Sequence, residues 1–233
     1  DQVEGYLFIV NSDGHMPVFM SIRKENLQGW VRYETNGSYK NIVNVNREMY
    51  LIVERTVNSG TVTFLEKMDN TRFLDASVNK VSGSATTSYQ IAHMPNTTVH
   101  VRSGNYSLGS YTTDGSGNLT LSSAVTSCEI GMNFTPQITT LPPEFQLEDG
   151  VSVGQKRRIV RAVLDLYETL NVKAKGTTIL IRSVIDDFSQ EPSKLTTRKE
   201  VYLLGWSKDG TVTITSDDPL PMSINGILLE VEI

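Results

Sequence analysis

The chain has 233 residues, of which 39% are hydrophobic and 20% are charged, and its formal net charge is −5 at pH 7. This is the composition of an ordinary soluble protein of one or two domains, and the acidic balance argues against wrapping nucleic acid through a broad basic face. The one cysteine, Cys128, excludes an internal disulfide framework and a multi-cysteine zinc site, and no apolar run approaches the ~20 residues of a membrane-spanning helix.

The chain begins with Asp1 rather than Met, and residues 2–10 already alternate in the manner of a β-strand. They lack the charged and apolar regions of a signal peptide. We therefore expect the sequence to be a fragment, a processed product or one part of a longer protein.

The first predicted unit, residues 1–78, is a string of short strands separated by turn signals. Asn36-Gly37 predicts a hairpin turn, because this pair accepts the positive φ angles of a type I′ turn. Asn58-Ser59-Gly60 predicts a second hairpin. Four or so antiparallel strands suit one blade of a propeller or a small sheet, and a blade would be completed by missing residues or a neighbouring subunit. The expected strands cover residues 6–10, 17–23, 29–33, 49–57 and 61–68.

The second predicted unit, residues 79–127, is a small β-hairpin module. Residues 78–88 are rich in Ser, Thr, Gly and Asn, so we expect a loop there. Strands are expected at 97–103 and 106–112, and the Asp114–Asn118 stretch predicts a turn before another short strand at 119–121.

The third predicted unit, residues 128–233, is a C-terminal β domain. Within it, the apolar residues of 157–170 fit both helical spacing and strand alternation. Periodicity alone leans to a helix, whereas the all-β neighbourhood and the family resemblance described below favour a long strand. The predicted fold class is therefore all-β, with several small antiparallel sheet units and at most one helix. The other expected strands cover 129–134, 177–184, 199–205 and 211–216, and residues 223–233 close the chain.

Several short motifs follow one another in a fixed order along the chain. Ile130-Gly131-Met132 leads to a Thr140-Leu141-Pro142 corner, a basic stretch from Gly154 to Ile159 and an Asp218–Met222 ending. In this order the motifs resemble those of the nozzle proteins of short-tailed bacteriophages, also called tail tubular protein B, in their C-terminal portion. Residues 79–89 carry no such motif. The N-terminal third adds Asp13-Gly14, Glu25, Gly29-Trp30, Thr35-Asn36-Gly37 and Ile52–Arg55.

The resemblance implies a non-catalytic structural component of the virion, located in the phage tail. Six copies would form a ring around an axial channel and dock to a tail adaptor. The channel would retain the genome and later conduct DNA into the host without reading its sequence. At −5 per chain, six copies carry roughly −30, and an acidic lumen lets DNA pass because repulsion prevents lasting contacts. The resemblance implies no catalytic residue, metal ligand or cofactor.

A carbohydrate-binding or adhesin-like β module, as in a tail spike or a cell-surface protein, is the alternative hypothesis. It requires exposed aromatic side chains, and Trp30, Tyr33 and Trp206 are the candidates. Each tryptophan follows a glycine, and a large aromatic residue beside a turn is more often an anchor in a core or an interface.

A glycosidase is the enzymatic alternative, because two carboxylates on neighbouring strands can approach the separation that glycoside hydrolysis requires. The candidate acids are Glu66 with Asp69 or Asp75, and no other feature of the sequence selects this pair. Adjacent acids in an extended segment point to opposite faces, so Asp186-Asp187 and Asp217-Asp218 are expected to be solvated turn acids.

No metal site is expected from the sequence. His15, His93 and His100 have no metal-ligand spacing. The Asp114–Asn118 stretch resembles the start of a calcium loop, but Val125 stands where such a loop needs a bidentate glutamate. Cys128 is expected to be a small buried residue.

Lys156-Arg157-Arg158 is the one basic run. It could contact a phosphate backbone or an acidic patch on another subunit, or it could protect an exposed strand edge from wrong pairing. It could also pair with the acidic loop Glu144–Asp149, within one chain or between chains. Reversing the charge of Arg157 would test that pairing through assembly.

Overall fold

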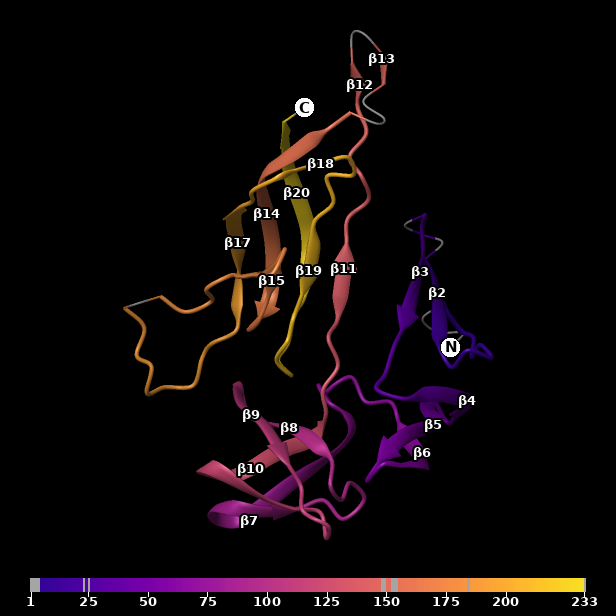
Figure 1. The fold of residues 1–233 in the computed structure, drawn as a ribbon, viewed down its shortest axis with the longest axis vertical. Helices are drawn as coiled ribbons and strands as arrows, with labels where there is room; N and C mark the ends of the chain where they lie inside the picture. The colour runs from indigo at the N-terminus through magenta and orange to yellow at the C-terminus, as the bar shows by residue number, and fades with distance from the viewer. Residues whose placement is uncertain are drawn as a thin grey trace. The chain divides into compact units, whose positions relative to one another are not determined.

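The computed structural model describes residues 5–22, 24, 26–147, 150–151, 155–183 and 185–232. These residues form small antiparallel sheets without an α-helix (Figure 1), so the predicted all-β class is confirmed. The chain divides into two compact units. The first comprises residues 1–103 and 108–134, and the second comprises residues 104–107 and 135–233. Among the described residues, no helix has the length and apolar character of a membrane span.

The N-terminal strands form two three-stranded sheets. One sheet has the order β1-β2-β3 and the other the order β4-β5-β6. The Asn58-Ser59 turn joins β5 to β6 as predicted, and both of its residues have positive φ. The strands are β1 (Tyr6–Phe8), β2 (Met16–Ile22), β3 (Leu27–Tyr33), β4 (Ser38–Val45), β5 (Glu48–Val57) and β6 (Gly60–Lys67).

The hairpin predicted at Asn36-Gly37 was wrong. Strand β3 pairs with β2, and β4 pairs with β5, so the segment between β3 and β4 crosses from one sheet to the next. A side chain from β5 stabilises this crossing, since Arg55 Nη1 donates a 2.8 Å hydrogen bond to the carbonyl oxygen of Asn36. Local turn propensity was overridden by this long-range contact.

The first unit also contains a four-stranded sheet with the order β7-β10-β8-β9. Residues 78–88, predicted as a loop, lie instead in the long strand β7, which pairs with β10 at residues 75, 78–81, 86 and 88–90. The predicted boundaries after residues 78 and 127 fall inside β7 and β10. The strands are β7 (Asp75–Gln90), β8 (Thr98–Ser103), β9 (Tyr106–Thr112) and β10 (Asn118–Met132).

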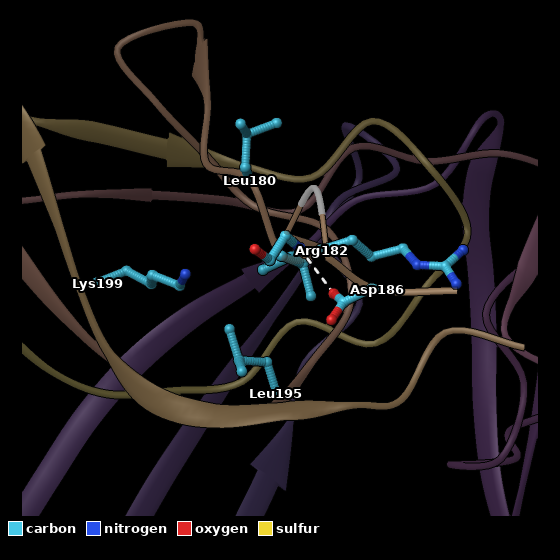
Figure 2. Close-up of a pocket in the computed structure, with 7 residues that line it drawn as sticks. Leu180, Arg182, Asp186, Leu195 and Lys199 are labelled. Carbon is cyan, nitrogen blue, oxygen red and sulfur yellow. Dashed lines mark hydrogen bonds between the residues drawn. The ribbon is translucent and has the colours of Figure 1, made fainter. Parts of the chain in front are cut away.

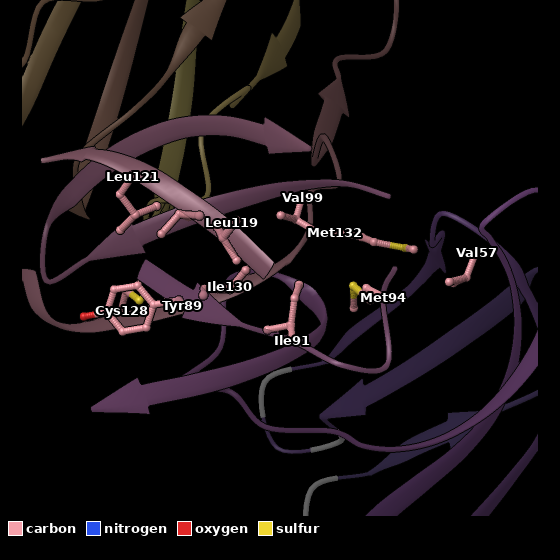
Figure 3. Packing of buried hydrophobic residues seen from close by; sticks show 11 residues of the cluster. Val57, Tyr89, Ile91, Met94, Val99, Leu119, Leu121, Cys128, Ile130 and Met132 are labelled. Atoms are coloured by element: carbon pink, nitrogen blue, oxygen red, sulfur yellow. The ribbon is translucent and has the colours of Figure 1, made fainter. Parts of the chain in front are cut away.

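A buried cluster of apolar side chains holds this sheet (Figure 3). Cys128 is one of its members and is 4% exposed, as expected for a small buried residue. The predicted turn before β10 is confirmed, and the Asp114 carboxylate accepts 2.8 Å hydrogen bonds from the backbone N–H groups of Ser116 and Asn118. The cluster comprises Val57, Tyr89, Ile91, Met94, Val99, Val101, Leu119, Leu121, Cys128, Ile130 and Met132.

The second unit is organised around β14 (Arg157–Thr169), which confirms the choice of strand over helix. It pairs with β17 (Leu195–Tyr202), with β18 (Trp206–Ser207) and with β20 (Ile224–Glu232), and Figure 1 shows it flanked by β17 and β20. The helical spacing was misleading because bulges interrupt the alternation along β14.

A second sheet of this unit has the order β11-β19-β15-β16, and its buried residues join the same apolar cluster as those of β14. Its strands are β11 (Gln137–Thr139), β15 (Lys173–Ala174), β16 (Thr177–Thr178) and β19 (Thr213–Thr215), and β12 (Gln146–Leu147) pairs with β13 (Gly150–Val151) separately.

Candidate functional site

The first candidate site is a buried charged cluster around Arg55. This residue follows Leu51 and Val53 on the inward face of β5, and its side chain is 1% exposed. Its guanidinium group binds both carboxylate oxygens of Glu66, at 2.6 and 2.7 Å. It also donates to the Thr35 hydroxyl at 2.7 Å. In the sequence, Arg55 was noted only as the end of the Ile52–Arg55 motif, although a charged residue in an inward apolar row is a recognisable signal of a buried ion pair.

Asp75, at the start of β7, completes this cluster. Its carboxylate lies 3.7 Å from Arg55 Nη2 and accepts a hydrogen bond from the Thr35 hydroxyl. Burial raises the pKa of Asp75, although Thr35 and Arg55 oppose the shift. Burial also raises the pKa of Tyr39 to about 12, with the charge of Asp75 contributing.

The structure therefore brings together one of the two acid pairs that a glycosidase would use. Glu66 and Asp75 both contact Arg55, whereas Asp69 accepts hydrogen bonds from Thr71 in its own turn. Glycoside hydrolysis requires one protonated acid and one free carboxylate facing the sugar. Here both oxygens of Glu66 are occupied by a guanidinium group that is itself buried, which is the arrangement of a structural ion pair.

A second buried ion pair lies in the same unit. The Glu129 carboxylate accepts hydrogen bonds from the backbone N–H groups of Phe73 and Leu74, at 3.0 and 3.1 Å. Arg102 Nε lies 3.7 Å from Glu129, and its guanidinium carbon lies 4.3 Å from the centroid of the Phe73 ring. These contacts fix the segment that leads into β7.

The three histidines do not converge. His93 Nε2 lies 3.0 Å from the carbonyl oxygen of Ala76, and its ring packs edge-on against Phe64. His15 lies in the turn before β2, and His100 is a half-buried residue of β8. Within the described residues, no group of three or more histidine, cysteine or acidic side chains is arranged to hold a metal ion.

The adjacent acids of the second unit, Asp186-Asp187 and Asp217-Asp218, differ in their exposure to solvent. Asp186, Asp187 and Asp217 are exposed, as expected of turn acids, and Asp217 pairs with Lys173. Asp218 is half-buried and accepts a 2.6 Å hydrogen bond from the side-chain amide of Asn171.

The basic run does not form a charged strand edge. Arg157 is buried, and its guanidinium group donates to the carbonyl oxygen of Pro143. Gly210 packs directly on this side chain, because a Cβ there would lie 2.6 Å from Arg157 Cγ and Cδ. Arg158 lies in the central strand, paired with both Trp206 and Glu232, so an edge-protecting role is excluded for these two arginines. Lys156 is exposed.

The structure describes only part of the acidic loop Glu144–Asp149 that the sequence offered as a partner for this run. Glu144 is exposed, whereas Glu148 and Asp149 lie outside the described residues. The contact that the structure does contain runs from Arg157 to the backbone of Pro143, just before the predicted acidic loop.

An open pocket of about 530 Å³ lies between β17 and the segment that follows β16 (Figure 2). Its apolar walls come from Leu180, Ile181 and Leu195. Charged side chains from Arg182, Asp186 and Lys199, together with Ser183, complete the lining. Sequence reasoning did not find this pocket, because its residues are brought together from two segments.

The tryptophans are exposed rather than buried. Trp30 is 60% exposed and Trp206 is 52% exposed. Trp30 packs on Phe19 of the neighbouring strand, with ring centroids 4.9 Å apart. Tyr33 pairs with the buried residue Met16, so it lies on the other face of the sheet and cannot share a binding platform with Trp30.

Strand β3 is exposed on both faces. It is an edge strand that pairs with β2 alone among the described residues. On the face that carries the buried residue Val18, its partner Val31 is 57% exposed, and on the other face Trp30 is exposed. The neighbouring apolar residue Leu27 is 45% exposed.

Comparison of the sequence with known protein families and with curated proteins gave no match.

Proposed function

We propose that the chain is a non-catalytic structural subunit of the tail nozzle of a short-tailed bacteriophage, located in the virion. The observation that carries this proposal is strand β3, an edge strand with exposed apolar side chains on both faces. Such an edge is a template for pairing with another chain. Assembly into a closed ring would cover it and would bury the apolar side chains.

The order of the sequence motifs, from Asp13-Gly14 to Asp218–Met222, supports the nozzle over other assemblies. By that resemblance the partners are further copies of the chain, six to a ring, and a tail adaptor. DNA would pass through the channel without sequence recognition. The net charge of −5 per chain supports this passage, since an acidic lumen repels the phosphate backbone.

The engagement of Glu66 by Arg55 supports a structural role for the acid cluster rather than a catalytic one. Both carboxylate oxygens accept charge-assisted hydrogen bonds from the Arg55 guanidinium group, so neither oxygen is left to face a sugar. A general acid for glycoside cleavage must instead contact the glycosidic oxygen.

Light scattering of the purified chain, combined with electron microscopy, tests the proposal. We expect a mass several times that of the monomer, in particles with a central passage. Val31→Lys should reduce the mass, because a charge on the exposed apolar edge of β3 opposes pairing. A wild-type chain that remains monomeric at its highest soluble concentration would contradict the role of β3.

Val81→Lys is the matched control for this experiment. Val81 is 82% exposed on β7, so the same substitution there changes surface charge equally and leaves β3 intact. If both variants lost mass to the same extent, general apolar adhesion would explain the association and the specific role of β3 would fail.

A carbohydrate-binding module is the second candidate, favoured by the exposed Trp30 ring packed on Phe19. Exposed aromatic faces pack against the apolar faces of sugars. On a glycan array this candidate predicts binding by the chain that Trp30→Ala or Trp206→Ala removes. Binding that neither substitution changes, or an absence of binding, would favour the nozzle.

A further inference from the structure

Lys199 occupies an unusual position in β17. It pairs with Leu164, which is fully buried, so it lies on the side of the sheet that faces the core of the second unit. Its chain neighbour Arg198 pairs with Asp165 on the solvent side. Among the described residues, the Lys199 ammonium group has neither an ion pair nor a hydrogen bond. The residue is half-buried, but its ammonium group is not among the buried polar atoms without a partner, so it is accessible to an anion from solvent.

The Lys199 side chain lines the pocket of about 530 Å³ and points toward the side that carries Asp186 (Figure 2). Leu180 and Leu195 lie on either side of this axis in the same view. The volume falls within the range of about 300–1,000 Å³ that small-molecule sites have. A cation at one end, an acid at the other and apolar walls between them define the chemistry of the ligand.

The wall opposite β17 is held in place by its own hydrogen bonds. Arg182 donates to the carbonyl oxygens of Asp187 and Gln190, at 2.7 and 2.9 Å, and its guanidinium group lies over the Phe188 ring. The Asp186 carboxylate accepts a 2.7 Å hydrogen bond from the Ser183 N–H. The pocket therefore exists before any ligand enters, which lowers the entropic cost of binding.

The other acid of this segment does not neutralise Lys199. The Asp187 carboxylate accepts hydrogen bonds from both the N–H and the hydroxyl of Ser189, at 2.9 and 2.7 Å. Hydrogen bonds from Ser189 lower the pKa of Asp187, so its charge is committed to its own turn. The Lys199 ammonium group therefore remains available to an anionic ligand.

We propose that this pocket binds an apolar residue that carries a free α-carboxylate, either as a free amino acid or as the C-terminal residue of a peptide. The carboxylate would pair with Lys199, and the apolar side chain would pack between Leu180 and Leu195. The donor group on the α-nitrogen would face Asp186. A dianionic phosphate fits less well, because Asp186 repels a second negative charge.

Titration of the full chain with small probes, followed by saturation-transfer NMR and calorimetry, tests the site. We expect N-acetyl-leucine or leucine to bind, and N-acetyl-leucinamide, which lacks the carboxylate, not to bind. Tighter binding of leucine assigns the free amino acid as the source, because its ammonium group meets Asp186. Tighter binding of N-acetyl-leucine assigns a peptide C-terminus.

Substitutions distinguish an effect of the Lys199 charge on binding from an effect on folding. Lys199→Met keeps the length of the side chain and should weaken binding by about tenfold or more, which is the usual effect of losing one charge-assisted hydrogen bond. Lys199→Arg should retain binding. Leu180→Ser should weaken binding with no effect on folding, since Leu180 is 75% exposed. Lys208→Met is the control, because Lys208 is an exposed lysine outside the pocket.

The competing explanation is that an inward-pointing lysine protects the edge strand β17 from pairing with other chains. In that case no probe binds the wild-type chain, and Lys199→Met aggregates. Equal binding of N-acetyl-leucine and its amide, or binding unchanged in Lys199→Met, would also overturn the proposal. None of these outcomes depends on whether the chain forms a ring.

Discussion

Two arginines of this protein have similar acidic partners and opposite surroundings. Arg55 of the first unit binds both oxygens of Glu66, and its side chain is 1% exposed. Arg161 of the second unit lies between Glu200 and Glu230, at 3.2 and 2.9 Å, and its side chain is 36% exposed. Water and salt screen the second group but not the first. Both arginines have two acidic partners, so the difference in burial leads us to expect that removal of Arg55 costs much more stability than removal of Arg161.

The largest expected effect is that of Arg55→Met. Removal of this guanidinium group leaves Glu66 and Asp75 without their cation, and breaking a buried pair in this way costs about 3–5 kcal/mol. Urea denaturation should show a correspondingly lower midpoint. The double variant Arg55→Met with Glu66→Leu should recover part of the loss, because fewer unpaired charges remain buried. A midpoint shift no larger than that of an Arg161 variant would break the comparison.

Arg157→Glu is expected to have the next largest effect, about 3 kcal/mol, because it buries an acid against a backbone carbonyl group. The sequence suggested that this reversal would act on assembly, whereas the structure places Arg157 in the interior of its own unit. We therefore expect a loss of unfolding free energy in the monomer. Lys156→Glu, at the exposed neighbouring position, should leave the denaturation midpoint unchanged. Normal stability of Arg157→Glu with altered assembly would restore the original interpretation.

The unfolding free energy should also depend on pH through Tyr39, which lies beside the buried Arg55 cluster. Burial, followed by the charge of Asp75, raises the pKa of Tyr39 to about 12. Because the folded state favours the neutral phenol, its stabilisation is complete below the ordinary pKa of about 10 and is lost as the pH rises through 12. This loss amounts to at most about 2.7 kcal/mol. Tyr39→Phe should remove it from a plot of unfolding free energy against pH.

Cys128→Ala is the control for that experiment, because burial raises the pKa of the Cys128 thiol to about 11. This variant should flatten a different and slightly lower part of the alkaline curve. If Tyr39→Phe and the wild type gave parallel curves up to pH 12, the assignment to Tyr39 would be wrong.

The smallest expected effect is that of Arg161→Gln. Exposed ion pairs contribute little, and salt screens them. We expect a denaturation midpoint nearly equal to that of the wild type at low salt and indistinguishable from it at high salt. A large loss that persists in high salt would show that the charged face of β14 is covered in solution, and it would remove the contrast with Arg55.

Local signals in the sequence succeeded where local geometry decides. The Asn58-Ser59 turn and the Asp114 turn were correct, because positive φ angles and carboxylate caps depend on neighbouring residues. The Asn36-Gly37 hairpin was wrong, because Arg55 ties this segment to a strand far along the chain. The loop predicted at 78–88 was wrong because its composition is polar, whereas pairing with β10 satisfies its backbone.

In the candidate sites, too, the sequence indicated individual residues but not the contacts between distant segments. The sequence offered Glu66 with Asp69 or Asp75 as candidate acids without selecting a pair, and it did not indicate that Arg55 joins Glu66 to Asp75. It gave no sign of the pocket at Lys199, because the lining comes from two segments that meet only in the folded unit.

The amino-acid sequence by itself determined the all-β class and the burial of Cys128, since alternation and turn chemistry are properties of neighbouring residues. For the long central strand at 157–170, periodicity alone leaned to a helix, and the strand followed only from its all-β surroundings and the family resemblance. Tertiary structure alone decided which strands share a sheet, and it placed Arg55, Arg157 and Lys199 on inward faces. The reason is physical. The burial of a charge depends on residues distant in the chain, and those residues supply both the partners and the exclusion of water.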